Sequence, residues 1–550
     1  MEQSPYLHAL DLFNRACFFD AHEVWEDVWR AAPPDEKQFL QGLIQIAVAF
    51  HHHSRGNLVG ARSLLKRGTR NLQGYPEEHG DLRLAVFLHS LVAWKRALAD
   101  GSPPPPLPHI ERCKGLGDGL LQSHFPVTAP SNQLHTVGAK PLATVPLLDL
   151  QRQYEQIRCE VLAAVGRVCA SQQYILGIEV QSFERDLAGF CGAKEAVGCA
   201  SGTDALWLAL VTAGVQPGDQ VLTTPFSFFA SASAIARAGA RPVFADINAA
   251  TFNLDPTKVE AHLRRSGYRK VRALLPVHLY GQCADMDRLQ PLTDEFHLAL
   301  IEDAAQAIGA SWRDCRAGSM GVAAAFSFYP TKNLSAYGEA GLVTTNDPEL
   351  AAHMRRLRNH GSSRRYLHEE LGWNSRLDAM QAAILRVKLK YLEGWNQARR
   401  QRAAGYDKLF AEAGLTAGRR SQSHAAGPRS EPASVSDSTI NHQPSTISAS
   451  SPVQLPQTSS NAHHIFHQYV VRAHRRDELR EFLSARHIGS EVYYPIPLHL
   501  QPCFAYLGYR EGDFPEAERA AKEVLALPMF PELTEDEQRW VVASVAEFYG

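Results

Sequence analysis

The sequence predicts an α/β protein with a largely parallel sheet, preceded by an all-α helical domain. From about Val145 onward, short β-branched and apolar runs alternate with helical patterns, which is typical of βαβ units. Before that point, apolar residues recur at the three- and four-residue spacing of amphipathic helices. At 550 residues the chain is also longer than one hydrophobic core usually organises, so we expect two or more domains.

The strands of the α/β part are predicted from short apolar runs with β-branched residues. Five such runs stand out: AVGCA (196–200), QVLTT (220–224), VRALLPV (271–277), LALIE (298–302) and AAAFSFY (323–329). In the N-terminal part, helical spacing runs through Phe13 to Trp29 and again through Phe39 to Phe50, and a proline run from Ser102 interrupts the end of this region.

Two segments lack periodicity and divide the chain. The stretch 123–144 is rich in Pro, Ser, Thr and Gly, so we expect a linker between a helical domain (1–122) and a large domain (145–400). The stretch 418–462 is dominated by Ser, Pro, Gln and Thr, which cannot bury enough apolar surface to offset the entropy of ordering. It is predicted to be a disordered insertion in a small C-terminal domain (401–550).

Bulk composition excludes several classes of function. With 56 basic and 58 acidic residues, the chain has no net field to gather nucleic acid or anionic lipid. No stretch resembles a signal peptide or approaches membrane-spanning length, so we expect a cytoplasmic protein whose partners are small molecules or protein chains. The nine cysteines are scattered and never spaced as CxxC, which argues against a disulfide framework or a zinc site. We therefore expect no metal.

A lysine follows one predicted strand directly. In SFYPTKNLSAYGEAG (327–341), an apolar strand runs out into a polar turn of small residues, which holds Lys332 near a cleft. With a lowered pKa, such an amine can form a Schiff base. Asn333 and Ser327 flank the lysine, and the Ser327 hydroxyl can donate to a phosphate. Taken alone, a lysine after a strand is usually exposed to solvent.

Two carboxylates end another predicted strand. LALIEDAAQAIGA (298–310) places Glu302 and Asp303 where parallel strands present groups to ligands, beyond their carboxyl ends. Either acid can keep a pyridine nitrogen protonated, and Asp303 is the preferred candidate. Gln306 can hydrogen-bond a phenolic oxygen. The alternative is that the acids cap a helix beginning at Ala304.

Two further signals follow strands. CASGTDALWLAL (199–210) brings a strand to Ser201, Gly202 and Thr203 and then to a helix, whose N–H groups can bind phosphate, although such residues are often plain N-caps. TTPFSFFASASA (223–234) places Phe226, Phe228 and Phe229 after a strand, where one ring could stack on a flat ligand or simply join the core.

Together these signals supply what pyridoxal 5′-phosphate requires: a lysine, an acid, a flat neighbour and phosphate anchors. In this order and spacing, the chain resembles the DegT/DnrJ/EryC1/StrS sugar aminotransferases, over essentially all of residues 145–550 outside the 418–462 insertion. The resemblance implies the aspartate aminotransferase-like fold (fold type I of pyridoxal-phosphate-dependent transferases) with a small C-terminal α/β domain. Besides the motifs above, it rests on VPLLDLQRQY (145–154), QQYILGIEV (172–180), PVHLYGQCADMD (276–287), RNHG (358–361), GWNSRLDAMQAAIL (372–385), HQYVVR (467–472) and YYPIPLHLQPCF (493–504).

Carried over residue by residue, the resemblance implies a complete cofactor site. Lys332 would form the Schiff base, and Asp303 would face the ring nitrogen. The implied cofactor-binding set is Gly202, Thr203, Phe228, Asp303, Gln306, Ser327, Lys332, Asn333 and Asn374. Asn374 would reach the phosphate from the second subunit, which makes the active protein a homodimer. Arg376 and His499 lie in motifs near the substrate pocket.

Two positions depart from the family pattern. Ile178 stands where the family commonly has proline, and Ala340 stands where it usually has glycine, which puts the local turn geometry in doubt. The inferred chemistry does not involve either residue.

The resemblance implies transamination in two stages. An amino donor, by family habit glutamate, leaves its amino group on the cofactor, and a nucleotide-linked keto-sugar then takes it up. PVHLYGQCADMD and QQYILGIEV look most like members that act on 3-keto rather than 4-keto sugars. The alternatives are a sugar dehydratase or lyase with the same cofactor, and a non-catalytic protein that senses a ligand.

The N-terminal segment 18–68 resembles the DUF309 family, a small helical domain of unknown function. His22 and Glu26 lie one turn apart, while Gln41, Gln45 and His52 share a face of the next helix. Facing each other, they could bind a metal or an anion, but a buried polar cluster that fixes helix packing is the favoured interpretation. The triple His51-His52-His53 is not expected to form a ligand set, because consecutive helical residues point in different directions.

Overall fold

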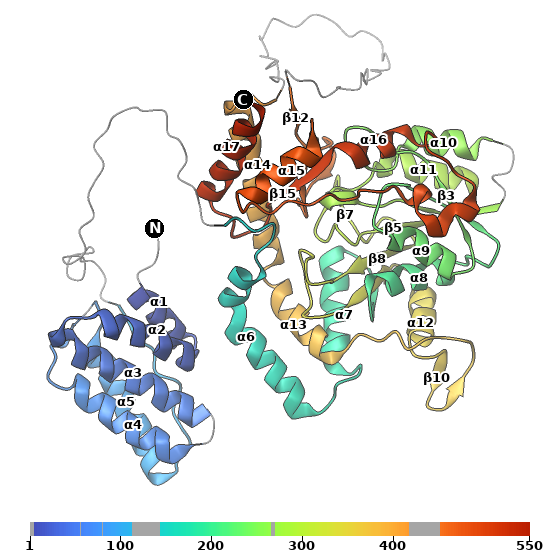
Figure 1. Ribbon diagram of the computed structural model, residues 1–550. Coiled ribbons are helices and arrows are strands. Elements are labelled where there is room, and N and C mark those ends of the chain that lie inside the picture. Colours follow the sequence, from blue (N-terminus) through green and yellow to red (C-terminus); the bar gives the residue numbers. More distant parts are fainter. Residues whose placement is uncertain (1–4, 55–56, 80, 113–143, 266–269, 417–450) are drawn as a thin grey trace, which may run out of the picture. The chain divides into compact units, whose positions relative to one another are not determined.

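The structure of the protein is a computed structural model that describes residues 5–54, 57–79, 81–112, 144–265, 270–416 and 451–550. It divides into two compact units, residues 1–136 and 137–550 (Figure 1). We call them the helical unit and the α/β unit and describe each by itself.

The described part of the helical unit is a bundle of α-helices packed around aromatic side chains. The predicted first helix is interrupted, because Ala16 has a positive φ of 62° and α2 starts after it. Phe13, Phe18, Trp25 and Phe50 are buried and form neighbouring ring contacts. The helices are α1 (Pro5–Asn14), α2 (Phe18–Ala31), α3 (Pro34–Ser54), α4 (Leu58–Leu72) and α5 (Leu84–Asp100).

The polar residues singled out in this unit do not form one cluster. His22 Nε2 lies 3.2 Å from Glu26 Oε1 on α2. Gln45 instead accepts from Asn71 Nδ2 at 3.2 Å, while His52 pairs with Asn57, so both face the α4 side. Among the described residues no hydrogen bond or ion pair joins the two sets, and a shared metal or anion site stays an untested alternative.

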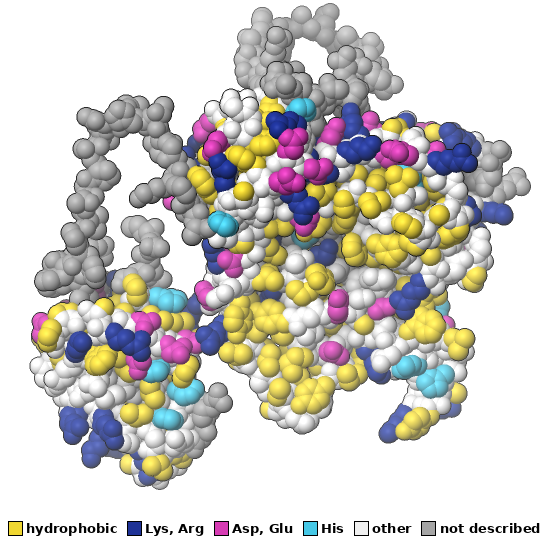
Figure 2. All heavy atoms as spheres, in the orientation of Figure 1, with side chains coloured by type: hydrophobic (Ala, Val, Ile, Leu, Met, Phe, Trp, Pro, Cys, Tyr) yellow, Lys and Arg dark blue, Asp and Glu magenta, His cyan; other side chains and the backbone are white. Residues whose placement is uncertain are grey.

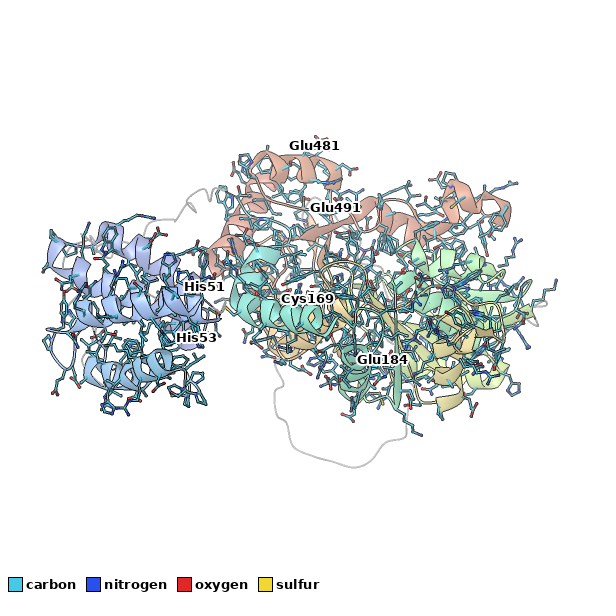
Figure 3. All side chains as sticks on the ribbon, turned by 90° about the horizontal axis from the view of Figure 1, so that it is seen from below. His51, His53, Cys169, Glu184, Glu481 and Glu491 are labelled. Atoms are coloured by element: carbon cyan, nitrogen blue, oxygen red, sulfur yellow. The ribbon has the colours of Figure 1, made fainter. Side chains whose placement is uncertain are left out.

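The three consecutive histidines diverge, as predicted. The rings of His51 and His53, marked at the end of α3 in Figure 3, pack against Phe19 at 5.1 Å and against Trp94 at 4.9 Å respectively.

The α/β unit is built on a seven-stranded sheet with the order β1-β9-β8-β5-β4-β2-β3. All neighbours pair in parallel except β9, which is antiparallel to both β1 and β8. The predicted parallel sheet is thus confirmed, with one antiparallel strand inside it. Its strands are β1 (Glu195–Cys199), β2 (Gln220–Thr223), β3 (Arg241–Phe244), β4 (Val271–Leu275), β5 (Ala299–Asp303), β8 (Ala323–Ser327) and β9 (Gly341–Thr345).

Helices cover both faces of this sheet (Figure 1), because its central strands are apolar on both sides. One buried cluster contains α8 (Gly202–Thr212), α9 (Ala230–Arg237) and α12 (Pro348–Leu357). The helices whose buried residues belong to the opposite cluster are α6 (Leu150–Ser171), α7 (Ile178–Cys191), α10 (Pro256–Leu263), α11 (Met286–Phe296) and α13 (Ala379–Leu389).

The C-terminal part forms its own core beside a three-stranded antiparallel sheet with the order β12-β14-β15. Its elements are β12 (Val453–Gln454), β14 (Tyr469–Ala473), β15 (Val524–Leu527), α14 (Leu392–Glu412), α15 (Arg476–Ala485), α16 (Pro515–Glu523) and α17 (Glu535–Tyr549). Short 3-10 turns lie at Leu279–Gly281, Leu498–Leu500 and Pro502–Leu507. The remaining strands are β6 (Ser311–Trp312), β7 (Cys315–Arg316), β10 (Ser362–Arg364), β11 (Leu367–His368) and β13 (Ala462–His463).

The predicted disordered insertion extends too far. Most of it lies outside the described residues, but its last part, 451–462, contains β12 and the start of β13. Val453 is 1% exposed and joins the C-terminal core, so this stretch has the apolar anchor that its Ser/Pro-rich composition hides. The predicted linker also lies outside the described residues, apart from Thr144.

The two departures from the family pattern are accommodated. Ile178 opens α7 at an exposed position, and Gly177 before it supplies the positive φ of 84°. Ala340 is buried without a positive φ, so its methyl group fits the turn. A search of the described residues found no helix that is both long and apolar enough to cross a membrane.

Candidate active site

The candidate site lies at the end of the sheet to which its parallel strands point, which we call the sheet edge. Strands β1, β5 and β8 run parallel to one another, so their carboxyl ends lie together there. β1 ends just before Ser201, β5 ends at Asp303, and β8 ends at Ser327 shortly before Lys332. The parallel sheet therefore brings together groups that are far apart in sequence.

Lys332 lies in a turn that is closed by two backbone hydrogen bonds. Its N–H donates to the Tyr329 carbonyl at 2.8 Å, and the Ala336 N–H donates to the Phe328 carbonyl at 2.8 Å. Although part of the Lys332 side chain is exposed, loss of hydration around the amine lowers its pKa to about 8, and the negative charge of Asp303 opposes the shift. The lysine that was predicted as a reactive amine thus has the lowered pKa that this role requires.

Asp303 is a buried acid, 3% exposed, held in a fixed orientation. Its Oδ2 accepts from Ser231 Oγ at 2.7 Å and its Oδ1 from the Ala305 N–H at 3.2 Å. Burial raises its pKa, while these hydrogen bonds and the charge of Lys332 act against that rise. Ser231 was not predicted, although it lies within the TTPFSFFASASA motif.

Glu302, the neighbouring acid, faces the other side of the strand. It is fully buried and accepts from the N–H groups of Gly318, Met320 and Gly321 at 2.8–2.9 Å, and it also pairs with His278 Nε2 at 3.0 Å. Because successive strand residues point to opposite faces, only one acid can serve the site. Glu302 is therefore bonded within the protein, whereas Asp303 points to the opposite face of the strand.

The start of α8 forms a cradle for an anion. Ser201 Oγ caps the Asp204 N–H, but among the described residues the N–H groups of Gly202 and Thr203 have no hydrogen-bond acceptor. A Cβ at Gly202 would lie 2.6 Å from Ser327 Cβ, so only glycine lets the helix come this close to the end of β8. The free N–H groups and the helix dipole together favour a bound phosphate.

β1 is locked in register beside this cradle. Glu184 of α7, marked inside the unit in Figure 3, accepts from the Gly198 N–H at 2.8 Å and pairs with the buried Arg358. A buried ion pair with a backbone donor fixes where the strand ends, and with it where α8 starts.

Two aromatic side chains, Phe228 and Tyr494, contact each other, and Tyr494 also bonds Gln306. Phe228 is 57% exposed and its ring centroid lies 6.2 Å from that of Tyr494, whereas Phe226 is fully buried. Gln306 Oε1 accepts from the Tyr280 N–H at 2.8 Å, and Gln306 Nε2 donates to the Tyr494 hydroxyl at 2.9 Å. Tyr494 was not predicted, although it lies in the quoted YYPIPLHLQPCF motif.

The other predicted site residues differ in their surroundings. Asn333 is buried and turned into the protein, where its amide bonds Asn396 and His467. Asn374 is exposed, and Arg376 donates to Asn359 Oδ1 at 3.1 Å. His499 is buried with its Nε2 3.0 Å from Glu518 Oε1, so its ring is held inside the protein.

Comparison with known proteins identifies the α/β unit. The model of the DegT/DnrJ/EryC1/StrS aminotransferase family matches residues 155–436 and 437–546. The chain belongs to this family. The model of a domain of unknown function, DUF309, matches residues 6–64 within the helical unit, so both resemblances drawn from the motifs are confirmed. Family membership makes the α/β unit an aminotransferase of the pyridoxal-phosphate-dependent type.

The α/β unit matches several relatives over nearly their whole length. A pleiotropic regulatory protein of Geobacillus stearothermophilus is 48% identical, over 74% of this chain and 98% of its own. The dTDP-3-amino-3,4,6-trideoxy-alpha-D-glucose transaminase of Streptomyces venezuelae is 42% identical, over 74% and 96%. The crystal structure of DesV from S. venezuelae with a ketimine intermediate superposes with a TM-score of 0.65 at 42% identity, over 74% and 98%.

The residues at the sheet edge fit pyridoxal phosphate. The cradle that a Cβ at Gly202 would fill, with free N–H groups beside Ser327, suits the phosphate. The buried Asp303 carboxylate suits a protonated ring nitrogen, and Lys332 offers an amine of lowered pKa on the same edge. When bound, pyridoxal phosphate supplies an aldehyde that takes up an amine and a ring that withdraws electrons from the neighbouring carbon.

The lowered pKa of Lys332 predicts how its reactivity depends on pH. In the cofactor-free protein the Lys332 amine is protonated and unreactive below about pH 8, so its acetylation should rise with pH, reach half its limit near pH 8 and then level off. Mass spectrometry of the Lys332 peptide after brief acetylation measures this profile. A midpoint near the ordinary lysine value of 10.5 would contradict the buried environment.

The glycine cradle predicts a strong effect of one methyl group. Gly202→Ala should weaken pyridoxal phosphate binding by about ten-fold or more, because the new Cβ must push Ser327 away. Gly189→Ala in α7 is the matched control, since nothing lies within 4 Å of its Cβ. Equilibrium titration of both variants measures the effect, and equal affinities would show that phosphate does not use the cradle.

Proposed function

We propose that the α/β unit transfers an amino group from glutamate to a nucleotide-linked keto-sugar, at C3 in preference to C4, with Lys332 as the lysine that bonds the cofactor. The observation that carries the proposal is that Lys332 and the buried Asp303 follow neighbouring strand ends at the sheet edge, where the N–H groups at the start of α8 are free. The choice of C3 is supported by relatives named as 3-amino-sugar transaminases. One of them, from Acidithiobacillus ferrooxidans, is named as a 3-aminotransferase of UDP-N-acetyl-3-dehydro-alpha-D-glucosamine. It is 39% identical, over 72% of this chain and 95% of its own.

In this proposal each residue has a defined task. Lys332 takes the proton from the α-carbon of the amino donor and later returns one to the sugar carbon. A base whose pKa lies near 8 can accept and return a proton close to neutral pH. Asp303, oriented by Ser231, holds its negative charge against the pyridine nitrogen. Gly202, Thr203 and Ser327 bind the phosphate, Phe228 stacks on the ring, and Gln306 lies near the phenolic oxygen.

The substrate can be identified by assay. Purified protein with pyridoxal phosphate and glutamate should aminate 3-keto nucleotide sugars at a kcat/KM at least about ten-fold above that for the 4-keto isomers. If no keto-sugar is aminated while glutamate is still deaminated, the substrate class is wrong. A preference for 4-keto sugars would overturn only the choice of carbon.

We also propose that two copies share each active site, with Asn374 reaching the phosphate of the partner. An apolar surface beside Asn374 supports this, since Tyr366, Leu371 and Trp373 are 83%, 91% and 45% exposed. Hydrophobic side chains also gather over α6 and the segment that follows it (Figure 2). Those exposed there include Leu162, Tyr174, Ile175 and Ile178. Exposed apolar surface of this extent is typical of an interface.

A mixing experiment tests the shared site. Lys332→Ala and Asn374→Ala chains should each be impaired alone. Refolded together in equal amounts, they should regain about a quarter of wild-type activity, because half the dimers are mixed and one of the two sites in each is intact. No gain on mixing would contradict a shared site, and the Asn374→Ala chain mixed with wild type serves as control.

A further inference from the structure

Asn396, a buried residue of α14, links the two segments that carry the site. Its Nδ2 donates to the Ile308 carbonyl at 3.0 Å, in the segment that follows Asp303. Its Oδ1 accepts from Asn333 Nδ2 at 2.8 Å, in the turn that follows Lys332. One amide therefore fixes both segments to the same point.

The backbone leaves room for this link. Gly309 has a positive φ of 88°, and a Cβ at this position would lie 2.5 Å from Asn396 Nδ2. Only glycine suits both the conformation and the close approach. The segment after Asp303 is thus shaped around the Asn396 amide.

A third segment, which contains His467, also contacts Asn333. Asn333 Oδ1 lies 2.9 Å from His467 Nδ1, and His467 is 7% exposed. The backbone of His467 is fixed as well, because its carbonyl accepts from Arg399 Nη1 at 3.2 Å and a Cβ at Gly281 would lie 2.8 Å from its nitrogen. The side chain of His467 therefore has a fixed place beside the Lys332 turn.

The direction of each hydrogen bond from Ile308 through Asn396 and Asn333 to His467 follows from the first of them. The Ile308 carbonyl can only accept, so Asn396 Nδ2 must donate to it and Asn396 Oδ1 must accept from Asn333. Asn333 Oδ1 is then the acceptor for His467, which must carry its proton on Nδ1. His467 Nε2 is left as a bare acceptor, without a hydrogen bond to any described residue.

Two other buried histidines have the opposite tautomer, which makes His467 distinguishable. His278 Nδ1 accepts from the Ala284 N–H at 3.1 Å, and His464 Nδ1 accepts from the Phe466 N–H at 2.9 Å. Burial holds the pKa of His467 well below its usual range, and the charge of Lys332 adds to this. His467 is therefore a neutral ring and adds no second positive charge beside Lys332.

We propose that Asn396 and His467 are positioning residues for the Lys332 amine: through Asn333, Asn396 holds Lys332 in register with Asp303 and holds His467 as its neutral Nδ1–H tautomer. The proposal rests on the proposed function for its effect on turnover. The hydrogen bonds and the tautomer of His467 do not depend on that function, because they exist in the protein without substrate.

The tautomer can be measured in the full chain with ¹⁵N-labelled histidine. We expect the His467 Nδ1 signal at the position of a protonated nitrogen and the Nε2 signal at that of a bare one, with His278 and His464 showing the reverse. The signal is assigned by its loss in His467→Asn. A protonated Nε2 on His467 in the wild-type protein would overturn the proposal, whatever the enzyme proves to catalyse.

A variant tests the effect on Lys332. Asn396→Leu keeps the size of the side chain but removes both bonds. It should mix the His467 tautomers, move the pH midpoint of Lys332 acetylation and lower kcat about ten-fold, with KM changed less than about two-fold. Gln538→Leu is the matched control, since its buried amide donates to the Arg402 carbonyl on α14, outside the network that joins Lys332, Asn333 and His467. Equal losses in both variants, or an unchanged tautomer and midpoint in Asn396→Leu, would reduce Asn396 to a structural residue.

Discussion

Lys332→Ala is expected to lower transamination by about 10⁴-fold or more, because Lys332 is the lysine of the turn that follows β8 and its amine has a pKa lowered to about 8. The variant should also lose the covalent attachment of pyridoxal phosphate, which reduction with borohydride followed by mass spectrometry detects. Its fold should survive, because removing an ammonium that has lost much of its hydration removes a desolvation cost. Thermal unfolding of the cofactor-free protein is therefore expected at the same or a higher temperature.

Lys390→Ala is the matched control for this variant. Lys390 lies just after α13 and is exposed, where it pairs with Glu160 at 3.1 Å, so its loss should leave turnover within about two-fold. Retention of more than about a hundredth of wild-type turnover by Lys332→Ala would show that another amine carries the reaction.

Asp303→Asn and Glu302→Gln are expected to separate chemistry from stability at adjacent positions. In Asp303→Asn the amide oxygen can still accept from the Ala305 N–H, and the Ser231 hydroxyl can turn to accept from the new NH₂, so the protein should fold normally. The neutral amide can no longer hold the ring nitrogen protonated, and kcat should fall by roughly 10²- to 10³-fold. Steady-state kinetics with saturating cofactor measure this loss.

Glu302→Gln should have the opposite profile. Three backbone N–H groups and His278 donate to the Glu302 carboxylate in a fully buried site, and an amide NH₂ would face some of these donors. Buried donors without an acceptor cost about 1–3 kcal/mol each, so we expect a loss of about 3 kcal/mol in the free energy of unfolding, measured by urea denaturation. Activity of the folded fraction should change little. If Asp303→Asn instead unfolds the protein while Glu302→Gln lowers kcat, the roles of the two acids are reversed.

The contrast between these two acids shows what could be predicted from the sequence. Five strands of the central sheet were predicted to within a residue or two, because each is an apolar run that ends in a polar turn. Asp303 was preferred over Glu302 from the sequence, but the groups that engage Glu302 come from the loop 318–321, which no local pattern reveals.

Two strands of the sheet escaped prediction for physical reasons. β3 (Arg241–Phe244) is four residues long and contains a proline, which is tolerated because it lies at the edge of the sheet. β9 (Gly341–Thr345) follows the Lys332 turn directly and pairs antiparallel, so the βαβ rhythm that predicts the other strands does not apply to it.

The missed site residues act across long sequence separations. Ser231 reaches Asp303 from the first turn of α9, and Tyr494 reaches Gln306 from the C-terminal part. Both lie in motifs that could be quoted from the sequence, but their roles depend on three-dimensional contacts. Asn333 was predicted to bind the cofactor from its place beside Lys332, whereas its buried amide is engaged by Asn396 and His467.

The most direct test of the central claim follows nitrogen from donor to sugar. Wild-type protein, pyridoxal phosphate, ¹⁵N-glutamate and a 3-keto nucleotide sugar should yield an amino sugar whose nitrogen is ¹⁵N, detected by mass spectrometry, and Lys332→Ala should yield none. An unlabelled amino sugar, or the same ¹⁵N yield from Lys332→Ala, would contradict transfer through the Lys332 site.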